Sequence, residues 1–452
     1  MDFNKEVLKI KDDMLRDLKT LCLIPSVMDM STAGKNQPFG KECRKALDQM
    51  LSFGQRDGFV TDDCDGYAGH IDIGEGDEAF GILGHLDVVP ANPTGWKHPQ
   101  YDCTLDGEYL YGRGVADDKG PLLAAYYAAK IVNQMDFDKK YKIRVIFGCN
   151  EENGSACVDY YFKHRPYPVM GFTPDADFPV VYGEKAICRF SAKGKAENND
   201  LISFSGGTVI NIVPGEATVH VKKDLTDAFL AFINENHVQG EATTLDEKNF
   251  KYVLKGKSAH ASLPEAGINS ISLMAHFLNQ HIDNDLVKYI DAHFYNDVHG
   301  EKLLGKKWEG AMGVLTSNLA LIDYKDNVFE FSVDMRMPHE LTKEILIPIL
   351  KEKTKGMDLE YDYTDSLYVD PNSELIQKLH NSYVEFTGDH IHGPQAIGGG
   401  TYAKEMPNCV AFGCEFPGRD NAMHQDDEHI LLDDLLVSTA IYAKALYDLL
   451  QK

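Results

Sequence analysis

The chain has 452 residues, of which 43% are hydrophobic and 25% are charged, and its formal net charge is -25. This composition is typical of a globular protein long enough for two or three domains. The strong negative charge excludes nucleic acid and anionic membrane as expected partners, since both bind to a basic face. We expect most of the acidity to serve solubility and a smaller part to lie around bound cations.

The cysteines and the N-terminus indicate where the protein works. The nine cysteines are scattered without a Cys-x-x-Cys pair, and no segment approaches the ~20 apolar residues of a membrane span. Such cysteines are typical of buried, reduced thiols. The first residues do not combine a basic stretch with an apolar one, as a signal peptide does. We therefore expect a cytoplasmic protein.

The first part of the chain predicts helices that alternate with strands. Apolar residues at spacings of three, four and seven predict an amphipathic helix over 3–22, and a second helix is expected over 40–53. Short strands around 59–61 and 70–73 precede a buried strand at 80–89. His85 and Asp87 lie two residues apart in that strand, so an extended chain would place both on one face.

Acidic residues then follow each predicted strand or precede a helix. Asp117 comes after a glycine-rich loop and just before a helix at 122–135, and Glu151 with Glu152 follows a buried strand at 142–149. Asp175 follows another short apolar stretch. The alternation predicts an α/β fold, with a mixed, mainly parallel sheet flanked by helices. Sites in such sheets form at the carboxyl ends of the strands, where these residues fall.

The pattern changes after residue 184. Short alternating stretches predict strands, including 251–254 and 328–335, and helices are expected at 269–277 and 341–353. The α/β pattern returns later and closes with a helix at about 431–450. We therefore predict a metal-binding catalytic domain of residues 1–183 plus 368–452 and an inserted α+β lid domain of residues 184–367.

Two histidines and three carboxylates form a candidate set of ligands for divalent zinc, manganese or cobalt. They are His85, Asp117, Glu152, Asp175 and His424. Each residue alone has a commoner explanation, since paired glutamates are usually solvated, an aspartate before a helix usually caps it, and a loop histidine needs no ligand. Their order and local settings favour the metal site.

Three segments carry a resemblance to a known family. Residues 84–90, 112–120 and 150–155 resemble the metal motifs of the co-catalytic zinc peptidases, the family of glutamate carboxypeptidase, aminoacylase, peptidase T and succinyl-diaminopimelate desuccinylase. The resemblance covers nearly the whole chain. The subgroup of dipeptidase PepV from Gram-positive bacteria is the most similar, through segments 172–179, 182–185, 256–262 and 423–428.

The resemblance implies a role for each candidate ligand. Asp117 would bridge two metal ions, His85 and Asp175 would complete one site, and Glu152 and His424 would complete the other. Zinc is the first expectation for both ions, with manganese or cobalt as alternatives.

The resemblance also implies roles for neighbouring residues. Asp87 would orient His85, and Glu151 would be the general base that moves a proton from the attacking water to the leaving amine. The peptide bond between Asp117 and Asp118 is expected to be cis, a rare state for a bond that does not precede proline.

Residues of the lid domain and of a glycine-rich stretch would complete the site. His260 would stabilise the oxyanion, Arg336 would bind the carboxylate of the substrate, and Asn211 would join the same site. The stretch 398–401 would offer backbone groups to the substrate, through Gly399, Gly400 and Thr401. A surface salt bridge for Arg336 and a turn for Asn211 are the structural alternatives.

These features together predict a metal-dependent dipeptidase that hydrolyses unprotected dipeptides with broad specificity, including β-alanyl or Xaa-His dipeptides. The alternative on the same fold is an N-acyl amino acid deacylase or a metallocarboxypeptidase. A non-enzymatic binding protein is a third hypothesis, which the completeness of the ligand set disfavours. The expected partner is a small peptide substrate, and the resemblance to the PepV subgroup implies a monomer.

Overall fold

The computed structural model describes residues 2–197 and 200–452, and it divides the chain into two compact units. The first unit contains the residues up to Gly183, together with Tyr368–Gln395 and Gly400–Lys452. The second unit contains Glu184–Leu367 and the short piece Ala396–Gly399. The sequence interpretation had placed that short piece with the catalytic domain.

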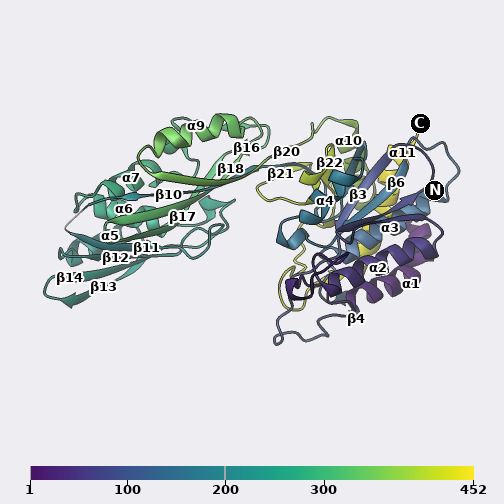
Figure 1. Cartoon of the computed structure of the whole chain (residues 1–452), viewed down its shortest axis with the longest axis horizontal. Coiled ribbons are helices and arrows are strands. Elements are labelled where there is room, and N and C mark those ends of the chain that lie inside the picture. The colour runs from purple at the N-terminus through teal and green to yellow at the C-terminus, as the bar shows by residue number, and fades with distance from the viewer. Residues whose placement is uncertain (1, 198–199) are drawn as a thin grey trace. The chain divides into compact units, whose positions relative to one another are not determined.

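A mixed sheet forms the centre of the first unit (Figure 1). Its middle strands β6, β3, β7 and β22 run parallel, whereas β2 beside β6 and β9 beside β22 are antiparallel to them. Among the described residues its order is β1 (Val60–Cys64), β2 (Ala68–Ile73), β6 (Lys142–Gly148), β3 (Ala79–His85), β7 (Met170–Thr173), β22 (Cys409–Ala411), β9 (Val181–Glu184) and β20 (Leu367–Tyr368), with β21 (Gln395–Ile397) beside β9.

Helices cover both faces of this sheet, as its near-continuous burial requires. One face carries α1 (Phe3–Cys22), α2 (Lys41–Arg56), α3 (Lys119–Asn133) and α11 (Leu432–Leu450), and α10 (Glu374–Thr387) packs on α11. The other face carries α4 (Ala156–His164). Two glycines allow this close packing: a Cβ on Gly84 would lie 2.9 Å from Leu122 of α3, and a Cβ on Gly148 would lie 2.6 Å from Cys157 of α4.

Short elements at the carboxyl end of the sheet bring distant segments together. Strand β24 (His429–Leu431) pairs with β5 (Tyr109–Tyr111), which pairs with β4 (Thr104–Asp106). Strand β23 (Cys414–Glu415) pairs with β8 (Ala176–Asp177). The C-terminal part of the chain therefore packs beside loops from the N-terminal part. The remaining short elements of this unit are the 3-10 helices η1 (Met30–Thr32), η2 (Glu151–Asn153) and η4 (Tyr402–Glu405).

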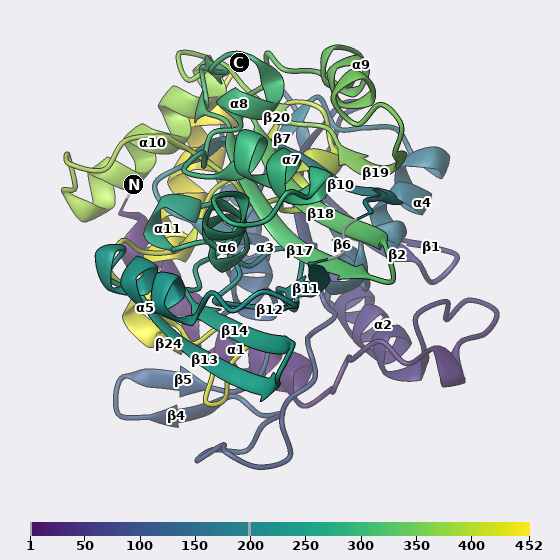
Figure 2. The ribbon, with the colours of Figure 1, turned by 90° about the vertical axis from the view of Figure 1, so that its left-hand side faces the viewer.

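The second unit is an antiparallel sheet with helices on one face (Figures 1 and 2). Its core consists of apolar side chains shared by sheet and helices, and strands such as β10 alternate buried and less buried residues because the other face lacks these helices. Its strand order is β13 (Gln239–Asp246), β14 (Asn249–Lys255), β12 (Glu216–Val221), β11 (Leu201–Gly206), β17 (Thr316–Lys325), β18 (Val328–Met337), β10 (Ala186–Lys195) and β19 (Asp358–Thr364). The helices are α5 (Thr226–Glu235), α6 (Ser270–Asn279), α7 (Asp285–Phe294), α8 (Glu301–Leu304), α9 (Lys343–Lys353) and η3 (Pro264–Ala266), and a small hairpin pairs β15 (Glu309–Gly310) with β16 (Gly313–Val314).

All nine cysteines are buried and none forms a disulfide bond, which agrees with the expectation of reduced thiols. Within the described part of the chain, no helix is both long enough and apolar enough to cross a bilayer.

Candidate metal centre

Three of the candidate ligands meet at the carboxyl end of the central strands. His85 ends β3, Asp117 lies two residues before α3, and Asp175 follows β7. The Nε2 atom of His85 lies 2.9 Å from Oδ1 of Asp117 and 3.5 Å from Oδ2 of Asp175. These three side chains form one group that could hold a metal ion.

The other two candidates meet on the opposite oxygen of the same aspartate. Nε2 of His424 lies 2.7 Å from Oδ2 of Asp117 and 3.1 Å from Oε1 of Glu152. Asp117, Glu152 and His424 therefore form a second group that could hold an ion. Asp117 belongs to both groups and presents one oxygen to each, which is the geometry of a bridging carboxylate.

Asp87 lies beside His85, two residues past the end of β3. The Nδ1–H of His85 donates to the main-chain carbonyl of Asp87 at 2.9 Å, and the nearest carboxylate oxygen of Asp87 is 3.6 Å away. This bond fixes the tautomer in which Nε2 faces Asp117 and Asp175.

The carboxylates of Asp87 and Asp118 are fixed by main-chain N–H groups. Asp87 accepts hydrogen bonds from Glu151 at 3.1 Å and from Glu152 at 3.2 Å, and thereby holds the turn that carries both glutamates. Asp118 accepts the N–H of His85 at 3.0 Å. The peptide bond between Asp117 and Asp118 is cis, so that prediction is confirmed.

The ionisable groups of the centre shift one another strongly. Burial raises the pKa of Glu151 to about 8, and the nearby carboxylates Asp175, Glu152 and Asp117 add to the shift. Hydrogen bonds to Asp117 and Glu152 raise the pKa of His424 to about 10. Burial opposes the protonation of His85, but its bonds to Asp117, Asp175 and Asp87 outweigh burial and raise its pKa well above the usual range. In the metal-free protein both imidazoles therefore carry protons that partly neutralise the carboxylates.

The residues present fit a pair of divalent cations. Imidazole and carboxylate ligands together suit zinc, manganese or cobalt. Within each group the ligand atoms lie within 4.8 Å of one another, so one ion could contact all three. A cation in each group would replace the proton that lies between the histidine and the carboxylate, because a ligand histidine binds a metal only after it loses that proton.

We expect metal binding to release protons and to strengthen with pH. At pH 7 the imidazole of His424 is protonated because its pKa of about 10 lies above that pH. A ligand histidine must be neutral, so each displaced proton should raise the apparent affinity by about tenfold per pH unit between pH 6 and 8. Calorimetric titration in buffers of different ionisation enthalpy measures the released protons. The His424→Asn variant should release about one proton fewer, and an equal release would contradict the assignment.

The second unit brings together three of the other predicted residues. His260 lies beside Ser262, with 2.6 Å between Nδ1 and the hydroxyl oxygen. Burial and the positive charge of Arg336 lower the pKa of His260, so the imidazole is neutral at pH 7. The main-chain carbonyl of Asn211 accepts the N–H of Ala261 at 2.8 Å, which places Asn211 beside the His260 turn.

Arg336 is 3% exposed and forms a buried ion pair, whereas the structural alternative expected from the sequence was a salt bridge at the surface. Its Nε and Nη2 atoms donate to the two carboxylate oxygens of Asp334 at 2.5 and 2.9 Å. Its Nη1 donates to the carbonyl of Gly398 at 2.7 Å, and a Cβ on Gly398 would lie 2.7 Å from that of Ser262. Arg336, Gly398 and the His260 turn therefore form one cluster within the second unit.

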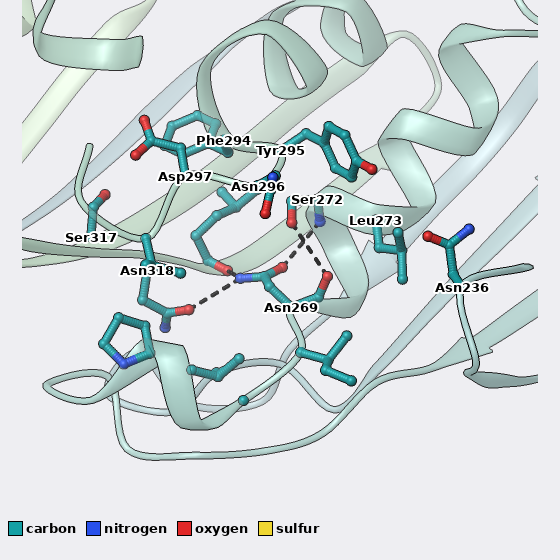
Figure 3. A pocket seen from close by; sticks show the side chains of 16 residues that line it. Asn236, Asn269, Ser272, Leu273, Phe294, Tyr295, Asn296, Asp297, Ser317 and Asn318 are labelled. Carbon is teal, nitrogen blue, oxygen red and sulfur yellow. Dashed lines mark hydrogen bonds between the residues drawn. The ribbon is translucent and has the colours of Figure 1, made fainter. Parts of the chain in front are cut away.

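A cavity of about 320 Å³ in the same unit is lined in part by Asn269, Phe294 and Asn318 (Figure 3). On its wall, Nδ2 of Asn269 donates to Oδ1 of Asn318 at 3.1 Å (Figure 3). Nδ2 of Asn318 donates to the carbonyl of Ile212 at 3.0 Å. These amides anchor the segment that carries Asn211. The cavity itself lacks the grouped histidines and carboxylates of the metal centre.

The glycine-rich stretch is divided between the units. Gly399 belongs to the second unit, whereas Gly400 and Thr401 belong to the first. The hydroxyl of Thr401 accepts the N–H of Ala403 at 3.1 Å and caps η4. The structure therefore gives Thr401 a capping role, and its contact with the substrate stays a prediction.

The sequence interpretation assigned no role to three buried residues beside the centre. Tyr402 places its ring 6.0 Å from that of His85 and its hydroxyl 2.7 Å from Sγ of Cys157. Arg113 and Glu428 form a buried ion pair at 2.6 Å. Arg113 and Glu428 lie inside segments that carry the family resemblance, and this position could have marked them as candidate site residues.

Comparisons with known proteins show which proteins the chain is similar to. The sequence pattern of peptidase family M20/M25/M40 matches residues 81–448. A protein of Staphylococcus epidermidis, provisionally named a dipeptidase, is 36% identical to this chain over 99% of both chains. YtjP of Bacillus subtilis, also provisionally named a dipeptidase, is 36% identical over 99% of this chain and 100% of the relative. The fold is similar to that of the aminoacylhistidine dipeptidase of Vibrio alginolyticus, with a TM-score of 0.59, 12% identity and coverage of 97% and 96% of the two chains.

Proposed function

The chain belongs to peptidase family M20/M25/M40, and we propose that it is a two-metal dipeptidase that hydrolyses the peptide bond of unprotected dipeptides. The observation that carries the proposal is the position of Asp117, whose Oδ1 lies beside His85 and whose Oδ2 lies beside His424. The names of the full-length relatives support the choice of dipeptides as substrate.

The five side chains would hold two divalent ions, with zinc as the first expectation and manganese or cobalt as alternatives. His85 and Asp175 would bind one ion, Glu152 and His424 the other, and Asp117 both. When bound, such a pair polarises the scissile carbonyl and lowers the pKa of the attacking water. His85 is held in the required tautomer by the carbonyl of Asp87.

Glu151 would move the proton during hydrolysis. Asp87 fixes the N–H of Glu151 and that of the ligand Glu152, so the two glutamates have different positions on one turn. Burial raises the pKa of Glu151, and a carboxylate with a raised pKa accepts a proton from water and returns it to the leaving amine more readily.

The second unit would act as a lid that supplies the remaining contacts. The neutral imidazole of His260 would donate a hydrogen bond to the oxyanion. Arg336 would bind the substrate carboxylate with the N–H groups that do not donate to Asp334 or to Gly398. Asn211 and the backbone of Gly399, Gly400 and Thr401 would position the rest of the dipeptide. We also expect a monomer, and the reduced cysteines favour the cytoplasm.

The deciding experiment compares three substrates with the metal-reconstituted protein. We expect release of free amino acids from Ala-Ala and little or none from Ala-Ala-Ala or N-acetyl-Ala-Ala. Preference for the acetylated compound would indicate a deacylase, and cleavage of the tripeptide at its carboxyl end would indicate a carboxypeptidase. If the protein binds two ions but hydrolyses none of the three substrates, the result would favour the hypothesis of a non-enzymatic binding protein.

A further inference from the structure

We infer that Glu428 and Arg113 are positioning residues that set the affinity of the second cation group, the one formed by Asp117, Glu152 and His424. The inference rests on the proposed two-metal function and extends it to two residues outside the ligand set. Both belong to the first unit, and their side chains are 0% and 2% exposed.

Glu428 binds the backbone of the loop that ends in the bridging aspartate. Its Oε1 accepts the N–H groups of Gly114 at 2.9 Å, Ala116 at 3.0 Å and Asp117 at 3.2 Å. A carboxylate that accepts several main-chain N–H groups fixes the path of that backbone. Glu428 therefore sets the position of Asp117 without touching the ligand oxygens.

Arg113 joins the same loop to the segment that carries His424. Its Nη1 donates to Oε2 of Glu428 at 2.6 Å, and its Nη2 donates to the carbonyl of Gln425 at 3.2 Å. The N–H of Gly112 donates to the carbonyl of Glu428 at 3.0 Å. Two segments more than 300 residues apart in the sequence are thus fixed to each other beside the metal centre.

The two cation groups depend on this connection to different degrees. His85 is carried by β3 and Asp175 follows β7, which are paired strands of the central sheet. His424 instead lies in a loop, its side chain is 53% exposed, and its φ of 62° is in the left-handed region. A loop in that conformation needs outside contacts to hold its shape. Loss of the Glu428 contacts should therefore weaken the second group more than the first.

The isosteric variant Glu428→Gln tests this dependence. A neutral amide has one oxygen and one NH₂ group, so it cannot accept the three N–H groups and the Arg113 bond together. Substitution of a residue that orients a metal ligand without binding the metal typically lowers metal affinity by about 10–100-fold. We expect the second dissociation constant to rise by about that factor, and the first, whose group shares Asp117, to rise by less.

The measurement is a stepwise titration of the metal-stripped protein with Co²⁺, in which calorimetry and the visible absorption of the bound ion monitor the binding. The matched control is Asp72→Asn, which breaks another buried ion pair of the first unit, that of Arg144 with Asp72 at 2.7 and 2.8 Å. This control should lower the melting temperature but leave both dissociation constants unchanged. Arg113→Lys, which keeps a positive charge beside Glu428, should give a smaller loss at the second site.

Each outcome decides the inference. A second dissociation constant that is unchanged in Glu428→Gln would overturn it, and so would equal weakening of both ions or the same loss in Asp72→Asn. If Glu428→Gln fails to fold, the smaller but selective loss in Arg113→Lys carries the test. A wild-type protein that binds fewer than two ions would overturn the proposed function as well, which separates the two failures.

Discussion

Replacing Glu151 with glutamine is expected to lower kcat by about 10²–10⁴-fold, the usual contribution of a general acid-base residue. The amide keeps the size of the side chain but cannot accept a proton from water. The N–H of residue 151 donates to Asp87 from the main chain, so the turn that carries the ligand Glu152 should be preserved. Activity should fall without loss of metal.

The measurement compares kcat and metal content in the same preparations. The Glu151→Gln protein should bind two ions with nearly wild-type affinity, whereas a Glu152→Gln protein should lose affinity for the ion held with His424. Hydrolysis by Glu151→Gln at a rate close to that of the wild type would show that another group moves the proton. Loss of metal in Glu151→Gln would instead place Glu151 among the ligands.

The sequence could predict which candidate ligands lie close together because strand ends can be recognised from local patterns. His85, Glu152 and Asp175 lie at or just past strands, and parallel strands bring their carboxyl ends to one edge of a sheet. His424 could not be placed in this way, since its loop follows no parallel strand of the central sheet. Its position beside Asp117 came from the family resemblance alone.

Pairings between distant segments lay outside what the sequence could give. The bond of Arg336 to the carbonyl of Gly398 and the bond of Glu428 to the N–H of Asp117 join residues that are 62 and 311 positions apart in the sequence, so they depend on how those segments fold against each other. The sequence also placed the end of the buried strand at residue 89, whereas β3 ends at His85. The main-chain carbonyl of Asp87, and not its carboxylate, accepts the Nδ1–H of His85.

Arg336 offers the sharpest test of how the substrate is recognised. We expect Arg336→Ala to raise KM for dipeptides with a free carboxylate much more than for the corresponding dipeptide amides. Hydrogen bonds to a charged group contribute about 1.5–3 kcal/mol, which corresponds to a rise in KM of about ten- to a hundredfold. Equal increases for both substrates would show that the guanidinium does not bind the carboxylate.

The ion pair with Asp334 makes the choice of control important. Removal of Arg336 leaves the fully buried Asp334 carboxylate with Arg189 at 3.2 Å, so part of any loss will reflect stability rather than binding. Asp334→Asn breaks the same pair from the other side but keeps the guanidinium. This control should also be less stable, yet it should still favour the free carboxylate over the amide. Because a purely structural role of the pair would affect both variants and both substrates alike, the ratio of the two KM values separates binding from stability.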